Sequence, residues 1–406
     1  VPLQDCEDGI HGERCVLNAS DQCHQEWCGH QMKERNSIWR KHLDKWIGCP
    51  LLFLLGLFHR KRERKLLNEK AVLNIVLIKT AAIGDTIILS AMVDEIKQQY
   101  PKSRITLICS KNNLAMVQLL RGVDNIFTFW MERPFHSLMQ LHTLGRFDLL
   151  LDFGPWPRIN GVISWMIRAD YKVGFKRVHT YRHYVYDQWV EHLDSLHEID
   201  NYRNILKVGG IKISGRRPYF ATFGDNVIKE RPYVVFHQYP GGAMEFQRKW
   251  AEERWVELGK CLYQKYGTCI LLSGAQLDQE EAEHSAQLMR RDGVAAKSIA
   301  GVYSLEQMAQ ILAGAVLVVS VNTGIMHLAA AVGAPLIALH GATSEKRWGP
   351  LSENAVVVKS GEPCQPCISL GFESKCTDPV CMQNITVDMV VCTAEQMLSS
   401  TKTAIG

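Results

Sequence analysis

Asn74-Ile75-Val76-Leu77-Ile78-Lys79 begins the regular part of the sequence, and Ala82-Ile83-Gly84-Asp85-Thr86 follows it almost directly. The first segment is short and mostly apolar, which predicts a buried strand, and the glycine in the second predicts a turn. Residues Ile87 to Tyr100 then predict a helix that ends before Pro101. A buried strand, a turn and a helix in this order indicate a parallel sheet that helices cover on both faces.

The same alternation continues along the chain and restarts after a polar stretch at residues 214–231. Further strands are predicted at 104–109, 147–152, 233–236, 269–272, 316–319 and 335–339, and a further helix at 251–266. We therefore expect an α/β protein with two Rossmann-like domains that face a cleft, at residues 71–220 and 230–385, and a C-terminal helix at 386–406. In such domains, ligands bind beyond the carboxyl ends of the strands.

The chain has 406 residues, with 46 Lys and Arg against 42 Asp and Glu, and 47% of its residues are hydrophobic. This balance excludes a wholly disordered chain and a strongly cationic nucleic-acid coat, so no nucleic-acid partner is expected. No apolar run reaches the ~18–20 residues that span a bilayer. The first residues lack the pattern of a secretory signal, which favours a cytoplasmic protein.

Residues 1–36 form a polar, cysteine-rich leader with Cys6, Cys15, Cys23 and Cys28. One interpretation is that residues 1–31 come from a start codon assigned too far upstream, because the first methionine is Met32. The other is a zinc site built on these cysteines and two nearby histidines, although their spacing fits no established pattern.

Residues 37–70 combine apolar and tryptophan side chains with a cationic run. Pro50 to Phe58 is almost entirely Leu and Phe, and the basic run occupies residues 59–65. The apolar segment is too short to span a bilayer, and this composition is typical of an amphipathic segment that lies on anionic lipid. The alternative is a helix that packs against the domain or against a partner subunit.

Asp85 stands where the first predicted helix begins. A carboxylate at this position is either an N-cap of the helix or a general base that the helix dipole keeps ionised. The turn has one glycine and lacks both the Gly-x-Gly-x-x-Gly pattern of dinucleotide-binding domains and a Walker lysine, which disfavours those two kinds of site.

Two turns in the second half of the chain indicate phosphate binding. Gly241 and Gly242 follow a strand and precede Arg248-Lys249, so backbone N–H groups and two cations are available to an oxyanion. The second turn, Val321-Asn322-Thr323-Gly324, opens a helix that carries His327 about one turn further on. The N–H groups at a helix N-terminus bind phosphate readily. His327 is either a ligand-binding residue or a buried core histidine.

These motifs, in their order and spacing, resemble those of glycosyltransferase family 9, the ADP-heptose lipopolysaccharide heptosyltransferases. The resemblance covers about residues 72–392 and rests on four segments: Ala82-Ile83-Gly84-Asp85, Arg248-Lys249-Trp250-Ala251-Glu252-Glu253-Arg254-Trp255, Ser320-Val321-Asn322-Thr323-Gly324-Ile325-Met326-His327-Leu328-Ala329, and Gly341-Ala342-Thr343-Ser344 through Arg347-Trp348-Gly349-Pro350.

The resemblance implies a GT-B fold and an inverting, metal-independent transfer of heptose from ADP-heptose to a lipopolysaccharide core or other glycan acceptor. It also implies a peripheral location at the inner face of the inner membrane. Asp85 matches the catalytic base. Donor-binding positions of the family are matched by Arg248, Ser304, Asn322, Thr323, Gly324 and His327, and Asp278 or Glu280 lies near the acid that contacts the ribose. Gly241, Gly242 and Lys249, from the first of the two turns above, are the further candidate donor-binding residues. Arg248 replaces a usual lysine, and Asn322 replaces a usual aspartate near the sugar.

Four late cysteines, Cys364, Cys367, Cys376 and Cys381, resemble a loop found in many members of the family. Four thiolates in one loop are able to hold a structural zinc or iron ion. Two disulfides and free thiols are the alternatives. No cofactor is expected for catalysis itself.

Three other functions compete with lipopolysaccharide heptosyl transfer. A transferase that modifies a protein, such as an autotransporter, would use the same donor. A catalytically silent nucleotide-sugar-binding subunit is suggested by Asn322. An NAD-dependent oxidoreductase is disfavoured because the glycine fingerprint is missing.

Overall fold

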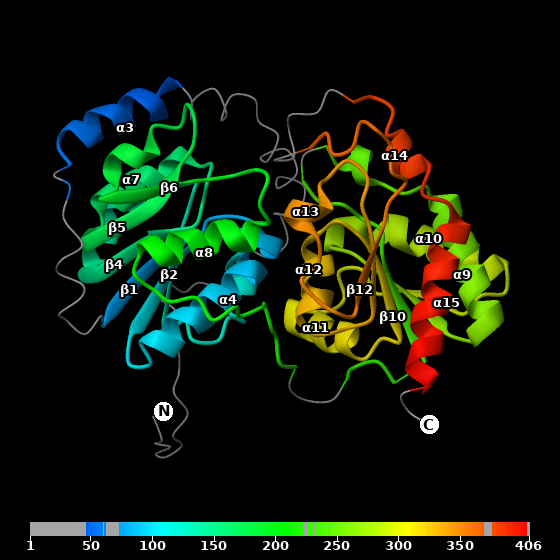
Figure 1. The fold of residues 1–406 in the computed structure, drawn as a ribbon. Helices are drawn as coiled ribbons and strands as arrows, with labels where there is room; N and C mark the ends of the chain where they lie inside the picture. The colour runs from blue at the N-terminus through cyan, green and yellow to red at the C-terminus, as the bar shows by residue number, and fades with distance from the viewer. Residues whose placement is uncertain are drawn as a thin grey trace, which may run out of the picture.

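The computed structural model describes residues 46–59, 61, 73–222, 226–229, 232–242, 244–368 and 376–403. The predicted leader at 1–36 and most of the basic run at 59–65 lie outside the described residues. The described chain forms two parallel six-stranded sheets, in two α/β domains that lie side by side (Figure 1).

The first sheet has the strand order β3-β2-β1-β4-β5-β6, and all of its strands run parallel. Its strands are β1 (Asn74–Ile78), β2 (Arg104–Ser110), β3 (Asn125–Phe129), β4 (Arg146–Asp152), β5 (Arg168–Lys176) and β6 (Gln188–Glu191). Its helices are α4 (Ile83–Gln99), α5 (Leu114–Val117), α6 (Pro134–Gln140), η2 (Leu141–Leu144), α7 (Arg158–Met166), η3 (Arg182–Val185) and α8 (Glu198–Val208). Continuous apolar strands such as β1 are buried on both faces because helices cover both sides.

The second sheet has the order β12-β11-β10-β7-β8-β9 and is also parallel. Its strands are β7 (Tyr233–His237), β8 (Cys269–Ser273), β9 (Ala296–Ser298), β10 (Leu317–Val321), β11 (Leu336–Leu339) and β12 (Ala355–Val358). Its helices are η4 (Glu245–Arg248), α9 (Glu252–Tyr266), η5 (Gln276–Asp278), α10 (Gln279–Arg291), α11 (Leu305–Ala313), α12 (Gly324–Ala331), α13 (Glu345–Trp348), α14 (Val380–Gln383) and α15 (Val387–Thr403).

The helix after the first strand begins earlier than predicted. α4 starts at Ile83, whereas the sequence suggested a turn up to Thr86 and a helix from Ile87. Ala82 has extended backbone angles and is the N-cap, and the Thr86 hydroxyl donates to the carbonyl of Ala82 at 2.8 Å. Glycine and aspartate are tolerated in a first helical turn, so the Gly84-Asp85 pair belongs to the helix rather than to the turn before it.

A separate helix, α3 (Gly48–Leu57), lies on the outside of the first domain against α7 and η3 (Figure 1). Leu52 is fully buried in a cluster with Val162, Val185 and Tyr186, so one side of α3 packs against the domain. Its other apolar side chains face outward, with Phe53, Leu54 and Leu57 about half to two-thirds exposed. In the described part of the chain, no helix combines the length and apolar character needed to cross a membrane.

The two domains touch through two glycines. α4 of the first domain packs against α12 of the second. A Cβ atom on Gly324 would lie 3.0 Å from Cγ2 of Ile83 and 3.3 Å from the backbone nitrogen of Gly84. The N-termini of the two helices therefore meet backbone to backbone, and this contact positions the candidate site.

Candidate active site

Asp85 lies in the first turn of α4, just beyond the carboxyl end of β1. Its Oδ1 atom accepts hydrogen bonds from Nζ of Lys79, at 2.7 Å, and from the hydroxyl of Tyr202, at 3.0 Å. The carboxylate does not cap α4, since Ala82 occupies the N-cap position and no side chain caps it. The capping alternative is therefore wrong, and Oδ2 accepts no hydrogen bond from any described residue.

The surroundings of Asp85 keep it ionised. Burial opposes ionisation, but the Lys79 ammonium and the hydrogen bonds from Lys79 and Tyr202 outweigh it, so the pKa of Asp85 lies below its usual value. Burial and the charge of Asp85 raise the pKa of Tyr202 well above its usual value. Tyr202 therefore remains a donor, and Asp85 is a carboxylate with one free oxygen, as a general base requires.

His327, from the second domain, packs against Gly84, the residue before Asp85. A Cβ atom on Gly84 would lie 2.7 Å from Cδ2 of His327, so only glycine allows this approach. His327 is 6% exposed, and its burial lowers its pKa to about 3. The ring is therefore neutral at neutral pH and adds no net charge beside Asp85.

Arg248 joins two turns at the carboxyl ends of β7 and β10. Its Nη2 atom donates to the carbonyl of Gly241 at 2.7 Å, and its Nη1 atom donates to the carbonyl of Asn322 at 3.2 Å. Gly242 adopts a positive φ of 97°, which glycine allows without strain. The predicted Gly241-Gly242 turn and the predicted turn at Asn322 are thus brought together by one guanidinium.

The N-terminus of α12 completes this group. Thr323 is the N-cap residue, and its Oγ1 accepts a hydrogen bond from the backbone of Met326 at 3.4 Å. The free N–H groups of the first helical turn, the positive end of the helix dipole and Arg248 together provide an anion site. The Asn322 side chain contacts the ring of His340, with Nδ2 at 3.3 Å from Nδ1. Burial lowers the pKa of His340 to about 4, so it is neutral.

The remaining predicted donor residues have partners of their own. Lys249 forms an ion pair with Glu281 at 3.4 Å, and both side chains are exposed. Asp278 accepts a hydrogen bond from the backbone of Ala275, and its pKa is raised by burial. Ser304 is the N-cap of α11. These contacts show local structural roles and do not join the three residues to the Arg248 group.

The chain matches the family model described as "Glycosyltransferase family 9 (heptosyltransferase)" over residues 162–377. This chain belongs to glycosyltransferase family 9. It is 25% identical over 320 residues to lipooligosaccharide heptosyltransferase 2 of Haemophilus ducreyi. The alignment covers 71% of this chain and 88% of that protein. The family assignment makes the protein a glycosyltransferase, as the sequence predicted.

Solved structures share the fold of this family-9 glycosyltransferase. A family-9 glycosyltransferase from Veillonella parvula superposes with a TM-score of 0.68 at 17% identity, covering 82% of this chain and 99% of that one. The Escherichia coli ADP-heptose LPS heptosyltransferase II superposes with a TM-score of 0.63 at 18% identity, covering 81% and 100%. The predicted GT-B architecture of two Rossmann-like domains is thereby confirmed.

Sequence reasoning on this family-9 glycosyltransferase missed the partners of Asp85. Lys79 was assigned only to the end of a strand, although an ionisable residue at the carboxyl end of a buried strand is a usable signal. Tyr202 is 117 residues from Asp85, and nothing local marks it. Arg347 lies in the last of the four family motifs, and the sequence alone indicates no role for it. It is buried and crosses between the domains to Asp194, at 2.9 Å.

The late cysteines are only partly described, because residues 369–375 lie outside the described chain. Among the described residues, no disulfide joins Cys364, Cys367, Cys376 or Cys381. Burial, with a smaller contribution from the nearby Cys367 and Cys364 thiols, raises the pKa of Cys381. Within the described residues, no three Cys, His, Asp or Glu side chains converge as metal ligands. The geometry described here does not fit a metal site, and a structural zinc or iron ion stays a prediction that elemental analysis of the purified protein tests.

Proposed function

We propose that this family-9 glycosyltransferase moves heptose from ADP-heptose to a hydroxyl group of a lipopolysaccharide core acceptor, with inversion at the anomeric carbon. The observation that carries the proposal is the position of Asp85. Its carboxylate, whose Oδ2 accepts no hydrogen bond from a described residue, lies beside Gly84, which contacts the turn that opens α12. The relative from Haemophilus ducreyi is named a lipooligosaccharide heptosyltransferase, which supports the choice of sugar and acceptor.

In the proposed reaction, the acceptor oxygen attacks the anomeric carbon of the heptose as the bond to the β-phosphate oxygen of ADP breaks. Oδ2 of Asp85 takes the proton of the acceptor hydroxyl, and ADP leaves. Lys79 and Tyr202 hold the other carboxylate oxygen, so they act as positioning residues. Fixing the base in this way reduces the entropy that must be lost in the transition state.

The departing diphosphate gains negative charge, and the second domain offers positive groups to stabilise it. Arg248 is fixed between Gly241 and Asn322, and the N–H groups at Gly324 lie at the positive end of α12. Preorganised donors of this kind stabilise developing charge without reorganisation. We propose that they serve here in place of a metal ion.

Asn322 is the residue that bears on the choice of sugar. Its side-chain amide contacts neutral His340 rather than a cation. An amide in place of a carboxylate keeps a hydrogen-bonding group at this position but removes a negative charge. We propose that Asn322 contacts sugar hydroxyl groups, with an effect on donor preference and not on the proton transfer.

The acceptor of the proposed reaction is anchored in lipid, and α3 supplies a surface for docking. Leu54 and Leu57 of α3 are 53% and 66% exposed, and Phe58, which directly follows this apolar helix, is 80% exposed. An apolar face of this kind on a water-soluble fold marks an interaction site. We propose that it rests on an anionic membrane surface, as an interfacial helix does.

Transfer assays with purified protein test the proposal. ADP-heptose, ADP-glucose and UDP-glucose are offered in turn with heptose-deficient lipopolysaccharide, deacylated core oligosaccharide or an autotransporter passenger domain. Product formation with ADP-heptose and core is the expected result, and the anomeric configuration is read by NMR. Transfer only to the passenger domain would replace the acceptor in the proposal. ADP-heptose binding with neither transfer nor hydrolysis would indicate a silent binding subunit.

A further inference from the structure

A pocket separate from the candidate active site lies in the first domain, at the edge of the sheet opposite to Asp85. It has a volume of about 390 Å³ and is lined by the start of β4, the start of β5, the end of α7 and the residues that follow α3. This volume lies within the range of small-molecule sites, ~300–1,000 Å³. Its lining includes four basic side chains and no part of the candidate active site.

Two arginines stand side by side at this edge. Arg146 and Arg168 are the first residues of β4 and β5 and are direct partners in the parallel register. Asp170 forms an ion pair with Arg146. By contrast, the side chain of Arg168 forms no hydrogen bond or ion pair with any described residue. The pair therefore carries an excess positive charge that faces the pocket.

The pocket wall behind these arginines is also polar. The amine of Lys172, a buried residue, donates to the backbone carbonyls of Ser164 and Trp165. His59 pairs with Asp187 at 3.2 Å on the wall that α3 contributes. Asp187 also accepts from the backbone nitrogen of Lys172, so its charge is already engaged. These contacts fix the wall and leave Arg168 as the group with free donors.

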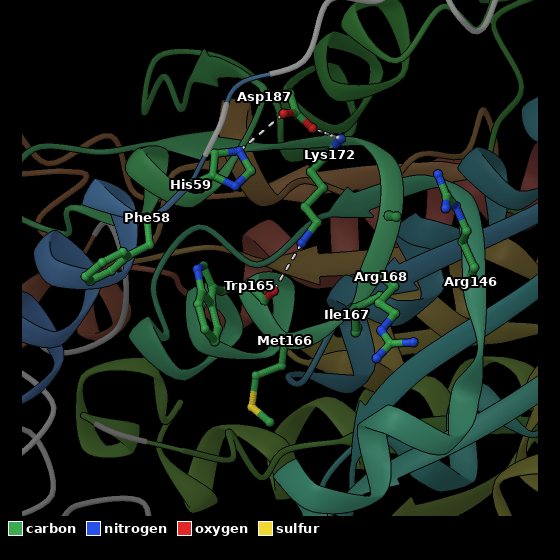
Figure 2. A pocket seen from close by; sticks show the side chains of 10 residues that line it. Phe58, His59, Arg146, Trp165, Met166, Ile167, Arg168, Lys172 and Asp187 are labelled. Carbon is green, nitrogen blue, oxygen red and sulfur yellow. Dashed lines mark hydrogen bonds and ion pairs between the residues drawn. The ribbon is translucent and has the colours of Figure 1, made fainter.

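The other side of the pocket is apolar and continuous with α3. Figure 2 shows Phe58 and Trp165 on one side of the pocket and Arg146 and Arg168 on the other. Phe58 directly follows α3 and is 80% exposed, and Trp165 is 37% exposed. An anionic group at the arginines would therefore lie next to an apolar surface that runs along the outside of the domain.

We propose that this pocket binds the phosphate of an anionic phospholipid headgroup while the exposed face of α3 enters the acyl region beside it. The proposal deepens the membrane docking proposed above and rests on it. Guanidinium groups bind phosphate oxygens in a bidentate manner, and the neighbouring aromatic rings suit the boundary between headgroups and acyl chains. α3 begins at Gly48, beside Arg158, and ends at Leu57, directly before Phe58 at the pocket, so a bound headgroup would fix the rotation of the enzyme about this helix.

Vesicle sedimentation of the full chain tests the proposal. The vesicles contain phosphatidylcholine alone or phosphatidylcholine with phosphatidylglycerol. Arg146→Gln/Arg168→Gln removes two charges at the pocket. Arg291→Gln/Lys297→Gln is the matched control, because it removes two exposed charges from the second domain. The expected result is a partition coefficient on anionic vesicles lower by about tenfold or more for the pocket variant and nearly unchanged for the control. Soluble glycerol phosphate should displace the wild-type protein from the anionic vesicles. It should have little effect on the remaining vesicle binding of the pocket variant.

Three results would overturn the proposal. Equal losses in the two double variants would show a diffuse charge effect, and no loss in either would show that the arginines do not contact lipid. If glycerol phosphate binding requires the two arginines but vesicle binding does not, the ligand of the pocket is a soluble phosphate compound. Heptosyl transfer to deacylated core is measured in the same preparations. Failure of transfer with an intact vesicle profile would count against the proposed function alone.

Discussion

Nζ of Lys79 and Oδ1 of Asp85 lie 2.7 Å apart at the end of β1, in an ion pair whose lysine is almost fully buried. The Lys79 amine also donates to the carbonyl of Phe153 at 3.3 Å, at the end of the neighbouring strand β4. The ammonium is thus held by the sheet, and the carboxylate is held by the ammonium. The orientation of the proposed base therefore follows from the parallel sheet itself.

Asp85→Asn should lower the turnover of heptosyl transfer by ~10²-fold or more, because the amide is nearly the same size but accepts no proton. ADP binding should change little, since the proposed donor-binding residues lie in the second domain. Steady-state kinetics and calorimetric titration with ADP measure the two effects. Asp94→Asn, on the same helix, is the control. Turnover close to that of the wild type would remove Asp85 from the mechanism.

Lys79→Met should shift the acidic limb of the pH–rate profile to higher pH. Lys79 is the main group that lowers the pKa of Asp85 against the opposing effect of burial. Without the ammonium, burial dominates, the pKa rises, and a higher pH is needed to ionise the base. A shift of about one pH unit or more is expected. Lys79→Arg keeps a positive charge near Asp85, so its acidic limb should lie closer to that of the wild type.

A surface ion pair provides the matched control for this experiment. Lys97 pairs with Asp124 at 2.8 Å, away from the site, and Lys97→Met should leave the pH profile unchanged. If Lys79→Met lowers the rate equally at every pH, then Lys79 only supports the fold and does not tune the base.

Arg248→Ala and Gly324→Val should both weaken binding of ADP. The first removes a charged donor, which is worth about tenfold or more in affinity. The second places a side chain against Ile83 and blocks the approach of phosphate to the helix backbone. Calorimetric titration compares both with Arg291→Ala, whose charge is remote. Unchanged affinity in both variants would place the diphosphate elsewhere.

The protein should lose stability steeply as the pH falls below about 6.5, the ordinary pKa of histidine. His237, His327 and His340 are buried, and burial lowers their pKa values to about 4, 3 and 4. In this range the unfolded chain binds protons that the folded chain does not bind. Each histidine therefore removes about 1.4 kcal/mol of unfolding free energy per pH unit.

Urea titrations between pH 7 and pH 5 measure this slope. His237→Gln should make the slope shallower by about one proton, because the buried His237 ring binds its proton only after unfolding. A slope that is the same in His237→Gln and in the wild type would show that His237 already binds its proton in the folded state.

The sequence predicted the parallel α/β architecture because buried strands are short apolar runs, and their positions agree closely with β1, β2, β4, β7, β8, β10 and β11. It also brought out Asp85 and Gly324, since glycine and aspartate beside an apolar strand are a local signal. The start of α4 was wrong because the same residues suit a turn. Tyr202 could not be found, since its contact with Asp85 is created only when α8 packs against α4.

The backbone contact between Gly84 and Gly324 limits how enzymes of this design can diversify. Main-chain atoms of the two glycines, with the side chains of Ile83 and His327, leave no room there, so even one added methyl group would act as a wedge between the proposed base and the proposed donor-binding turn. New acceptors or sugars must therefore be accommodated around this seam, in residues such as Asn322 and in the surfaces that present the acceptor.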